Sequence, residues 1–257
     1  MELREYTEQE LQAIADEVGE RRGWDFSRMS VERAPVTWEY LDVVSSFLRP
    51  TDVVLDIGTG GGERLLSLAD KCLCAVGVDP DPDMVRVARD NAARHTNVQF
   101  LPGSAERLDL LDDSAFDVVL TRHAPAFVPE LDRVTKAGGL FISQGVGSRN
   151  MANIRHAFNT GSEALYETAH QSFLSDLAAS GWRLVAEGHY DVRYWVKDVP
   201  SLIFWFQAIA GANEVPGDFS IAAHHGVINA LIQQFGSDRG LETNEHRTLV
   251  IAQKPDA

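Results

Sequence analysis

Between Asp52 and Gln144, short runs of apolar residues alternate with segments whose apolar residues recur at helical spacing. The runs are DVVLDI, LCAVGVD, NVQFL, FDVVLT and GLFISQ, and helical segments such as GERLLSLAD and PDMVRVARDNAAR lie between them. Apolar, β-branched strands joined by crossover helices are typical of a parallel sheet with both faces covered. Because such crossovers are right-handed, we predict a doubly wound α/β sheet.

The flanking regions predict further helices and two more strands. Thr7 and Glu10 form a capping box for a helix that ends at Gly23, and Pro35 is expected to open a second helix. After residue 146, the sequence predicts a helix that stops at Gly181 and then a long strand. The apolar segment PSLIFWFQAIAG is either a buried helix or part of a lid, AAHHGVINALIQQFG is an amphipathic helix, and HRTLVIAQK is a closing strand.

Net charge restricts the partners of this chain. There are 23 Lys and Arg residues against 38 Asp and Glu residues, a net charge of −15. Nucleic acids bind cationic surfaces, so we do not expect RNA or DNA as a partner. The polar N-terminus and the lack of an apolar stretch of about 20 residues predict a cytoplasmic protein without a membrane segment. Cys72 and Cys74 lack ligands at metal-binding spacing, so no metal site is expected.

A glycine-rich turn follows the first strong strand, in VVLDIGTGGGERLL at residues 53–66. Such a turn brings backbone close to a ligand at a helix N-terminus. A nucleoside-triphosphate loop would need a lysine after the last glycine, and Glu63 stands there instead. Glu63 also occupies the third glycine position of a dinucleotide loop that starts at Gly58.

S-adenosylmethionine, which has a cationic sulfonium and no phosphate, is better suited to the strand-terminal carboxylate of Asp56. Asp79, at the end of the next strand, can accept both ribose hydroxyls of an adenosine.

Five segments in this order resemble class I S-adenosylmethionine-dependent methyltransferases. They are VVLDIGTGGGE, VGVDPDPDMVRVAR, FLPGSAERLDL, FDVVLTRHA and VTKAGGLFIS, and together they cover roughly residues 50–145. The resemblance implies a seven-stranded, mostly parallel Rossmann-like sheet with an antiparallel last strand, N-terminal helices and a helical insertion before that strand. It also implies one domain over residues 1–257, with an N-terminal helical cap (1–49), a cofactor-binding core (50–145) and a substrate-side half (146–257) whose insertion spans about 197–240.

The resemblance assigns binding roles residue by residue. Asp56, Gly58, Thr59 and Gly60 match the loop around the methionine part of the cofactor, and Asp79 matches the ribose-binding acid. Gly61 and Gly62 have helix–strand packing as an alternative role, and Met84 is equally consistent with the core. Ser104 replaces an aspartate that is common at its position. The residues that match contacts to adenine or to the methyl donor are Pro80, Met84, Ser104, Ala105, Glu106, Thr121 and Arg122.

Methyl transfer needs positioning, and it needs a general base only when the acceptor must lose a proton. His123, in LTRHAPAF, is the candidate base, with a structural or substrate-positioning role as the alternative. The segment TRHAP lacks the N/D-P-P-aromatic run of base N-methyltransferases, and aromatic residues flank the core, so we expect a small-molecule acceptor. An RNA or protein methyltransferase, an NAD-dependent oxidoreductase and a non-catalytic cofactor-binding module are the alternatives.

Overall fold

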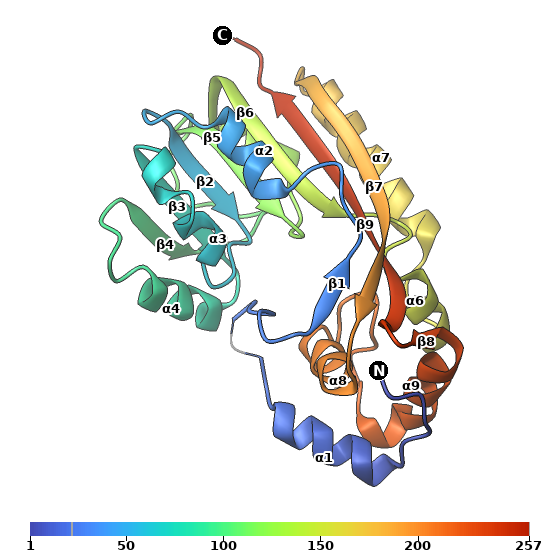
Figure 1. Cartoon of the computed structure of the whole chain (residues 1–257). Helices are drawn as coiled ribbons and strands as arrows, with labels where there is room; N and C mark the ends of the chain where they lie inside the picture. Colours follow the sequence, from blue (N-terminus) through green and yellow to red (C-terminus); the bar gives the residue numbers. More distant parts are fainter. Residues whose placement is uncertain (22, 257) are drawn as a thin grey trace. The chain divides into compact units, whose positions relative to one another are not determined.

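A computed structural model describes residues 1–21 and 23–256 of the chain (Figure 1). The contacts divide the chain into two compact units, each assembled from separate segments. Unit 1 consists of residues 1–36, 147–167 and 190–246, and unit 2 of residues 37–146, 168–189 and 247–257. The division passes through the predicted N-terminal cap at residue 36, and the assignment of one domain to the whole chain stays a prediction.

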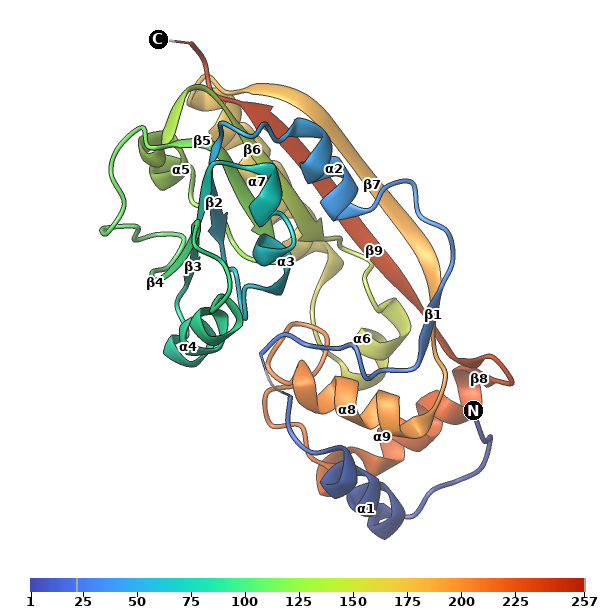
Figure 2. The ribbon, with the colours of Figure 1, turned by 60° about the vertical axis from the view of Figure 1, so that its left-hand side comes forward.

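Unit 2 is built on a parallel sheet with the strand order β9-β6-β5-β2-β3-β4 (Figures 1 and 2). Neighbouring strands from β6 to β4 are parallel, whereas β9 is antiparallel to β6. The predicted Rossmann-like sheet with an antiparallel last strand is therefore confirmed. The strands are β2 (Val53–Ile57), β3 (Cys74–Asp79), β4 (Val98–Pro102), β5 (Phe116–Arg122), β6 (Thr135–Val146) and β9 (Gly240–Gln253, shared with unit 1).

Helices cover both faces of this sheet, as the doubly wound prediction requires. One face packs against Tyr40 and Val44 of α2, Leu65 of α3 and Ala88 of α4. The other face packs against α5 and α7, for example through Leu131. Side chains alternate along each strand, so each strand supplies both layers. The helices of unit 2 are α2 (Tyr40–Phe47), α3 (Glu63–Leu66), the 3-10 turn Ala69–Lys71, α4 (Pro82–Asn91), α5 (Val128–Val134) and most of α7 (Glu163–Ala179).

Unit 1 has its own hydrophobic core, formed mainly by helices. The segment PSLIFWFQAIAG folds as the buried helix α8, whose Leu202, Ile203 and Phe206 are almost fully enclosed, which explains why it is apolar on every side. Asn229 of α9 bonds both the N–H and the C=O of Tyr6, at 2.8 Å each, and this holds the N-terminal segment on the helix. The elements are α1 (Glu8–Val18), β1 (Val31–Arg33), α6 (Ala152–Phe158), β7 (Arg183–Val196, shared with unit 2), α8 (Val199–Ala208), α9 (Ile221–Phe235) and β8 (Gly236–Ser237).

The N-terminal boundaries differ from those predicted. The capping box of Thr7 and Glu10 is present, but α1 ends at Val18 because Gly19 has a positive φ of 61°. Pro35 does not open a helix. Residues Val31–Arg33 instead pair antiparallel with β7, and α2 begins at Tyr40. The pairing partner lies more than 160 residues away, so local sequence gave no signal for it.

Two further details depart from the sequence prediction. The segment GERLLSLAD forms only the four-residue helix α3 followed by a 3-10 turn, and β1 and β8 extend the sheet beyond seven strands. Among the described residues, no helix combines the length and the apolar character needed to cross a membrane.

Candidate functional site

The glycine loop between β2 and α3 is tied to the end of the neighbouring strand β3. The backbone N–H groups of Gly58 and Thr59 both donate to the carbonyl oxygen of Val78, at 2.9 and 3.0 Å. The N–H of Gly60 donates to Oδ2 of Asp79 at 2.8 Å. The loop is therefore held at the carboxyl ends of two parallel strands, which is where ligands bind in open α/β sheets.

Two glycines of the loop are required by different contacts. Gly58 has a φ of +74°, and a Cβ there would lie 2.2 Å from Cβ of Ala124, in the segment that follows β5. Gly62 has a φ of +77°, and its Cβ would lie 2.5 Å from the ring of Phe100. Left-handed backbone and close approach both favour glycine. Gly62 therefore serves packing, the alternative raised for it above, whereas Gly58 fits the loop to the end of β5.

Asp56 is a buried carboxylate at the end of β2. It is 9% exposed and, among the described residues, forms no ion pair. Burial raises the pKa of Asp56 to about 6, although the positive charges of Arg64 and Arg122 oppose this rise. The hydroxyl of Thr59 opposes the same rise more strongly than either arginine, but its buried Oγ1 has no hydrogen bond of standard geometry to a described residue. The site therefore holds a negative charge that the chain itself compensates only in part.

Asp79 is also buried, and both of its carboxylate oxygens accept hydrogen bonds from backbone. Oδ2 accepts from Gly60 and Oδ1 accepts from the N–H of Asp81 at 3.0 Å. A carboxylate oxygen has two acceptor positions, so each oxygen keeps one. The carbonyl of Asp79 also accepts from the N–H of Gly103 at 3.1 Å, which brings the end of β4 to the same place.

The other residues predicted to contact the cofactor differ in exposure. Pro80 and Glu106 are exposed, and Ser104 and Met84 are partly buried. Met84 belongs to none of the three core clusters, so the core alternative raised for it is not supported among the described residues. Ala105 is buried in the core of unit 2 on the α5 side.

Thr121 and Arg122, the last two residues of β5, point to opposite faces of the sheet. Thr121 is fully buried, and its hydroxyl bonds Oγ of Ser143 at 2.8 Å. In β5, residues 118 and 120 pack on the face opposite to α5, so Arg122, two residues further along, lies on that face as well. Asp56 of the neighbouring strand β2 lies on the same face, because Leu55 and Ile57 on either side of it face α5. Of the two, only Arg122 has its side chain on the same face as Asp56.

His123 is the first residue after β5 and has a positive φ of 58°. Its backbone N–H donates to the carbonyl oxygen of Gln144 at 2.9 Å, and its Nε2 lies 3.4 Å from the side-chain Nε2 of Gln144. His123 is exposed, yet nearby protein atoms desolvate the ring and, with the positive charges of Arg122, Arg247 and Arg64, lower its pKa well below the usual value. His123 is therefore uncharged at neutral pH.

Three residues that the sequence did not identify support this region. The hydroxyl of the buried Tyr40 lies 3.1 Å from the carbonyl oxygen of Thr121. The indole N–H of Trp38 donates to Oε1 of Gln144 at 3.2 Å. Trp38 and Tyr40 belong to an aromatic segment whose position the family resemblance associates with the acceptor pocket, and Gln144 was the last residue of a predicted strand, but no local pattern placed any of the three beside His123.

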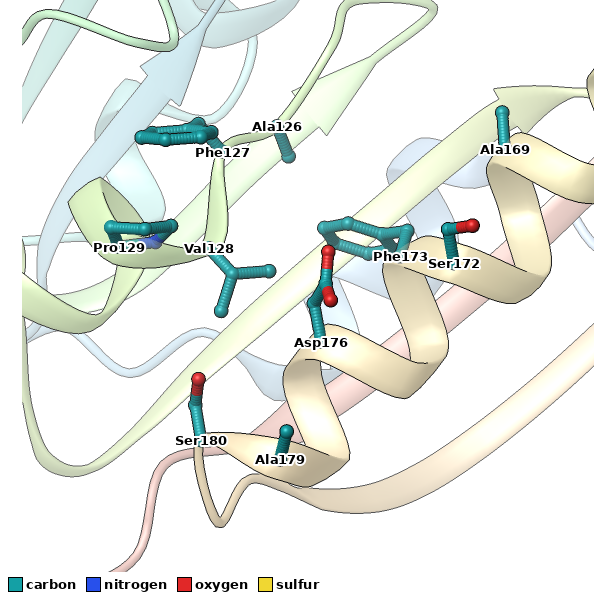
Figure 3. A pocket seen from close by; sticks show the side chains of 10 residues that line it. All are labelled: Ala126, Phe127, Val128, Pro129, Ala169, Ser172, Phe173, Asp176, Ala179 and Ser180. Atoms are coloured by element: carbon teal, nitrogen blue, oxygen red, sulfur yellow. The ribbon is translucent and has the colours of Figure 1, made fainter.

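The structure also contains a hollow in unit 2 that is separate from these residues. It has a volume of about 500 Å³ and lies between the segment Ala126–Pro129 and helix α7 (Figure 3). Phe127, Phe173 and Asp176 are among its lining residues, and none of the predicted site residues is. In the described parts of the chain, no three His, Cys, Asp or Glu residues are grouped to hold a metal ion, and both cysteines are free.

Comparisons with known proteins agree with this architecture. The family described as "Methyltransferase domain" matches residues 54–139. A malonyl-[acyl-carrier protein] O-methyltransferase from Marinomonas sp. strain MWYL1 is 26% identical over 228 residues, covering 82% of this chain and 83% of that protein. The uncharacterized methyltransferase YcgJ of Bacillus subtilis is 38% identical over 98 residues, which is 35% of this chain and 38% of YcgJ.

Solved structures share the fold at lower identity. The crystal structure of YcgJ superposes with a TM-score of 0.58 at 19% identity, covering 85% of this chain and 99% of YcgJ. The structure of the [4+2]-cyclase SpnF has a TM-score of 0.57 at 18% identity and covers 98% of both chains. At this identity, the likeness concerns the fold.

Proposed function

We propose that this chain is a class I methyltransferase that binds S-adenosylmethionine on the glycine loop of unit 2 and methylates a small-molecule acceptor. S-adenosylmethionine supplies an electrophilic methyl group on a cationic sulfonium, so the residues of the chain bind and orient and need no nucleophile of their own. The observation that carries the proposal is the buried, incompletely compensated carboxylate of Asp56 beside this loop.

Asp56 is complementary to a cation. A buried charge is costly unless it is paired, and the low effective dielectric there strengthens attraction to an α-amino group or sulfonium. The orphaned Oγ1 of Thr59, next to Asp56, offers a further polar contact to an amino acid moiety. A pyrophosphate at this position would be repelled by Asp56 and by Glu63, which argues against a nicotinamide dinucleotide.

Asp79 suits a vicinal diol. Each of its oxygens retains one acceptor position after binding Gly60 or Asp81, so the two oxygens can take one ribose hydroxyl each. The same carboxylate also accepts the N–H of Gly60. The side chain of Asp79 would therefore both bind the ribose and hold the glycine loop in place. The end of β4, bonded to Asp79 through Gly103, then lies where the adenine edge is expected.

A small-molecule acceptor is favoured by charge and by one relative. A net charge of −15 disfavours RNA. The Marinomonas relative is named for methylating a malonyl group on oxygen, a small acceptor group although a carrier protein bears it. The cyclase with the same fold is a reason to measure methyl transfer as well as cofactor binding.

Calorimetric titration with S-adenosylmethionine, S-adenosylhomocysteine and NAD tests the proposal. We expect binding of the first two and none of NAD. Asp79→Asn removes one carboxylate oxygen as an acceptor, so we expect affinity for S-adenosylhomocysteine to fall roughly 10-fold or more. Asp81→Asn is the matched control: it makes the same charge change two residues away, and Asn can still cap α4 through the N–H of Asp83.

Each outcome of these titrations has one meaning. Binding of NAD alone would show that the chain belongs to the oxidoreductase alternative. Equal loss of affinity in Asp79→Asn and Asp81→Asn would refute the ribose assignment while leaving the cofactor proposal in place. Normal cofactor binding without turnover on any acceptor would indicate a non-catalytic binding module.

A further inference from the structure

Three side chains of unit 2 form a chain of contacts that ends at His123. Nε1 of Trp38 lies 3.2 Å from Oε1 of Gln144, and Nε2 of Gln144 lies 3.4 Å from Nε2 of His123. Gln144 is only 3% exposed. Its backbone carbonyl also accepts the N–H of His123 at 2.9 Å, so one residue holds both the main chain and the ring of His123.

The chemistry of these groups fixes where the proton on the imidazole lies. An indole N–H can only donate, so the oxygen of the Gln144 amide must face Trp38. The NH₂ of the same amide then faces Nε2 of His123, and this ring nitrogen must be the acceptor. In a neutral imidazole the proton is consequently on Nδ1. A proton on Nε2 would place two donors against each other.

We propose that His123 acts at the methyl-transfer site as an uncharged hydrogen-bond donor through Nδ1–H, with Trp38 and Gln144 as the positioning residues that set this tautomer. The proposal rests on the proposed function for its role in the reaction, but the tautomer does not depend on it. It replaces the sequence-based expectation of a general base, because the nitrogen with a free lone pair is occupied by Gln144. His123 is then complementary to a lone pair on the acceptor, such as a carboxylate or carbonyl oxygen.

The surroundings of His123 are consistent with a neutral donor. Arg122 from β5, Arg64 from α3 and Arg247 from β9 are the charged groups that act on the ring, and all three disfavour a second proton on it. Arg122 and Gln144 are register neighbours, and Arg247 pairs with the residue two positions after Gln144, so these side chains lie on one face of the sheet. An oxygen with negative charge would find both a donor and a positive field there.

The first experiment measures the tautomer in the wild-type chain. Long-range ¹H–¹⁵N correlation spectra of ¹⁵N-labelled protein at pH 7, assigned with His123→Asn, should show Nδ1 protonated and Nε2 unprotonated. Gln144→Glu replaces the NH₂ by an oxygen that can only accept, so the proton should move to Nε2. Gln99→Glu makes the same charge change at an exposed position on β4 and should leave the spectrum of His123 unchanged. A proton on Nε2 in the wild type would overturn the proposal.

The second experiment separates a donor from a base by turnover. The side-chain amide of Asn can place an N–H close to the position of imidazole Nδ1, and Asn tolerates the left-handed backbone found at residue 123. We expect kcat of His123→Asn to stay within about 10-fold of the wild type and kcat of His123→Ala to fall roughly 10- to 100-fold. Circular dichroism should confirm that both variants are folded. A general base predicts the opposite pattern, with Asn as inactive as Ala.

The third experiment measures how kcat of Gln144→Glu, relative to the wild type, depends on pH. The new carboxylate raises the pKa of His123, so the ring carries Nδ1–H only while it is protonated. For a donor, the ratio of kcat in Gln144→Glu to kcat in the wild type falls as pH rises through that pKa. For a base, the ratio rises with pH, and this result would refute the proposal. If the wild type fails to bind S-adenosylmethionine, the proposed function is wrong, whereas the spectra still decide the tautomer.

Discussion

The buried carboxylate of Asp56 lowers the stability of the folded chain, although the proposed function requires its negative charge. Its pKa is raised from 3.8 to about 6 by burial, so the folded chain holds this proton more tightly than the unfolded chain does. As pH rises from about 4 to 6, the unfolded carboxyl ionises first, and stability is lost across that interval. Above pH 6 the full cost is present, about 3 kcal/mol at 1.36 kcal/mol per pKa unit.

Asp56→Asn should therefore stabilise the free protein while it weakens cofactor binding. We expect the free energy of unfolding in urea to rise by about 1–3 kcal/mol at pH 7 and the gain to disappear near pH 4. Affinity for S-adenosylmethionine should fall in the same variant, because its amide carries no charge to pair with a cation. Asp112→Asn, at an exposed carboxylate, is the control for the change in net charge. A variant that is less stable at pH 7 would contradict this account.

Among the elements, the glycine loop depends on a contact with the end of β5. Gly58→Ala would add a Cβ that lies 2.2 Å from Cβ of Ala124, at a φ that disfavours any side chain. We expect a loss of about 2–4 kcal/mol in unfolding free energy, measured by urea denaturation.

The double variant Gly58→Ala/Ala124→Gly separates the two causes of this loss. Removing the Cβ of Ala124 relieves the clash but not the left-handed backbone, so part of the loss should be recovered. Gly226→Ala, in helix α9 with no atom within 4 Å of the added Cβ, is the matched control and should stabilise by about 0.5–1 kcal/mol. If the double variant recovers nothing, Ala124 is not the residue that excludes a side chain from position 58.

At the scale of the whole molecule, the net charge predicts which class of acceptor receives the methyl group. Incubating the protein and cell extract with S-adenosylmethionine labelled in its methyl group, and then separating small molecules, RNA and protein, measures where the label goes. With a net charge of −15, we expect label in the small-molecule fraction and at most traces in RNA. Label that precipitates with RNA or with a protein other than a carrier would show that the small-molecule proposal is wrong.

Sequence by itself determined the sheet of unit 2 and the position of its loop. The continuous apolar runs of the strands and the glycines after Asp56 are local signals, because each reflects the burial or backbone conformation of a few neighbouring residues. Thus β2, β3, α4, β4 and β5 were predicted to within a few residues, and the sequence alone placed Asp56 and Asp79 at strand ends.

Only the tertiary structure decided the features that depend on pairing between distant segments. Residues Val31–Arg33 form a strand because they pair with β7. The side chains of Thr121 and Arg122 lie on opposite faces of the sheet, so only one of these two neighbours faces Asp56. The proton on His123 follows from Trp38 and Gln144, which are 85 and 21 residues away along the chain. Hydrogen-bond direction is a property of atoms in space, so no pattern in the sequence carried it. The sequence indicated a glycine loop suited to S-adenosylmethionine, whereas the proposal that His123 is a donor and not a base rests on the arrangement of Trp38 and Gln144 around it.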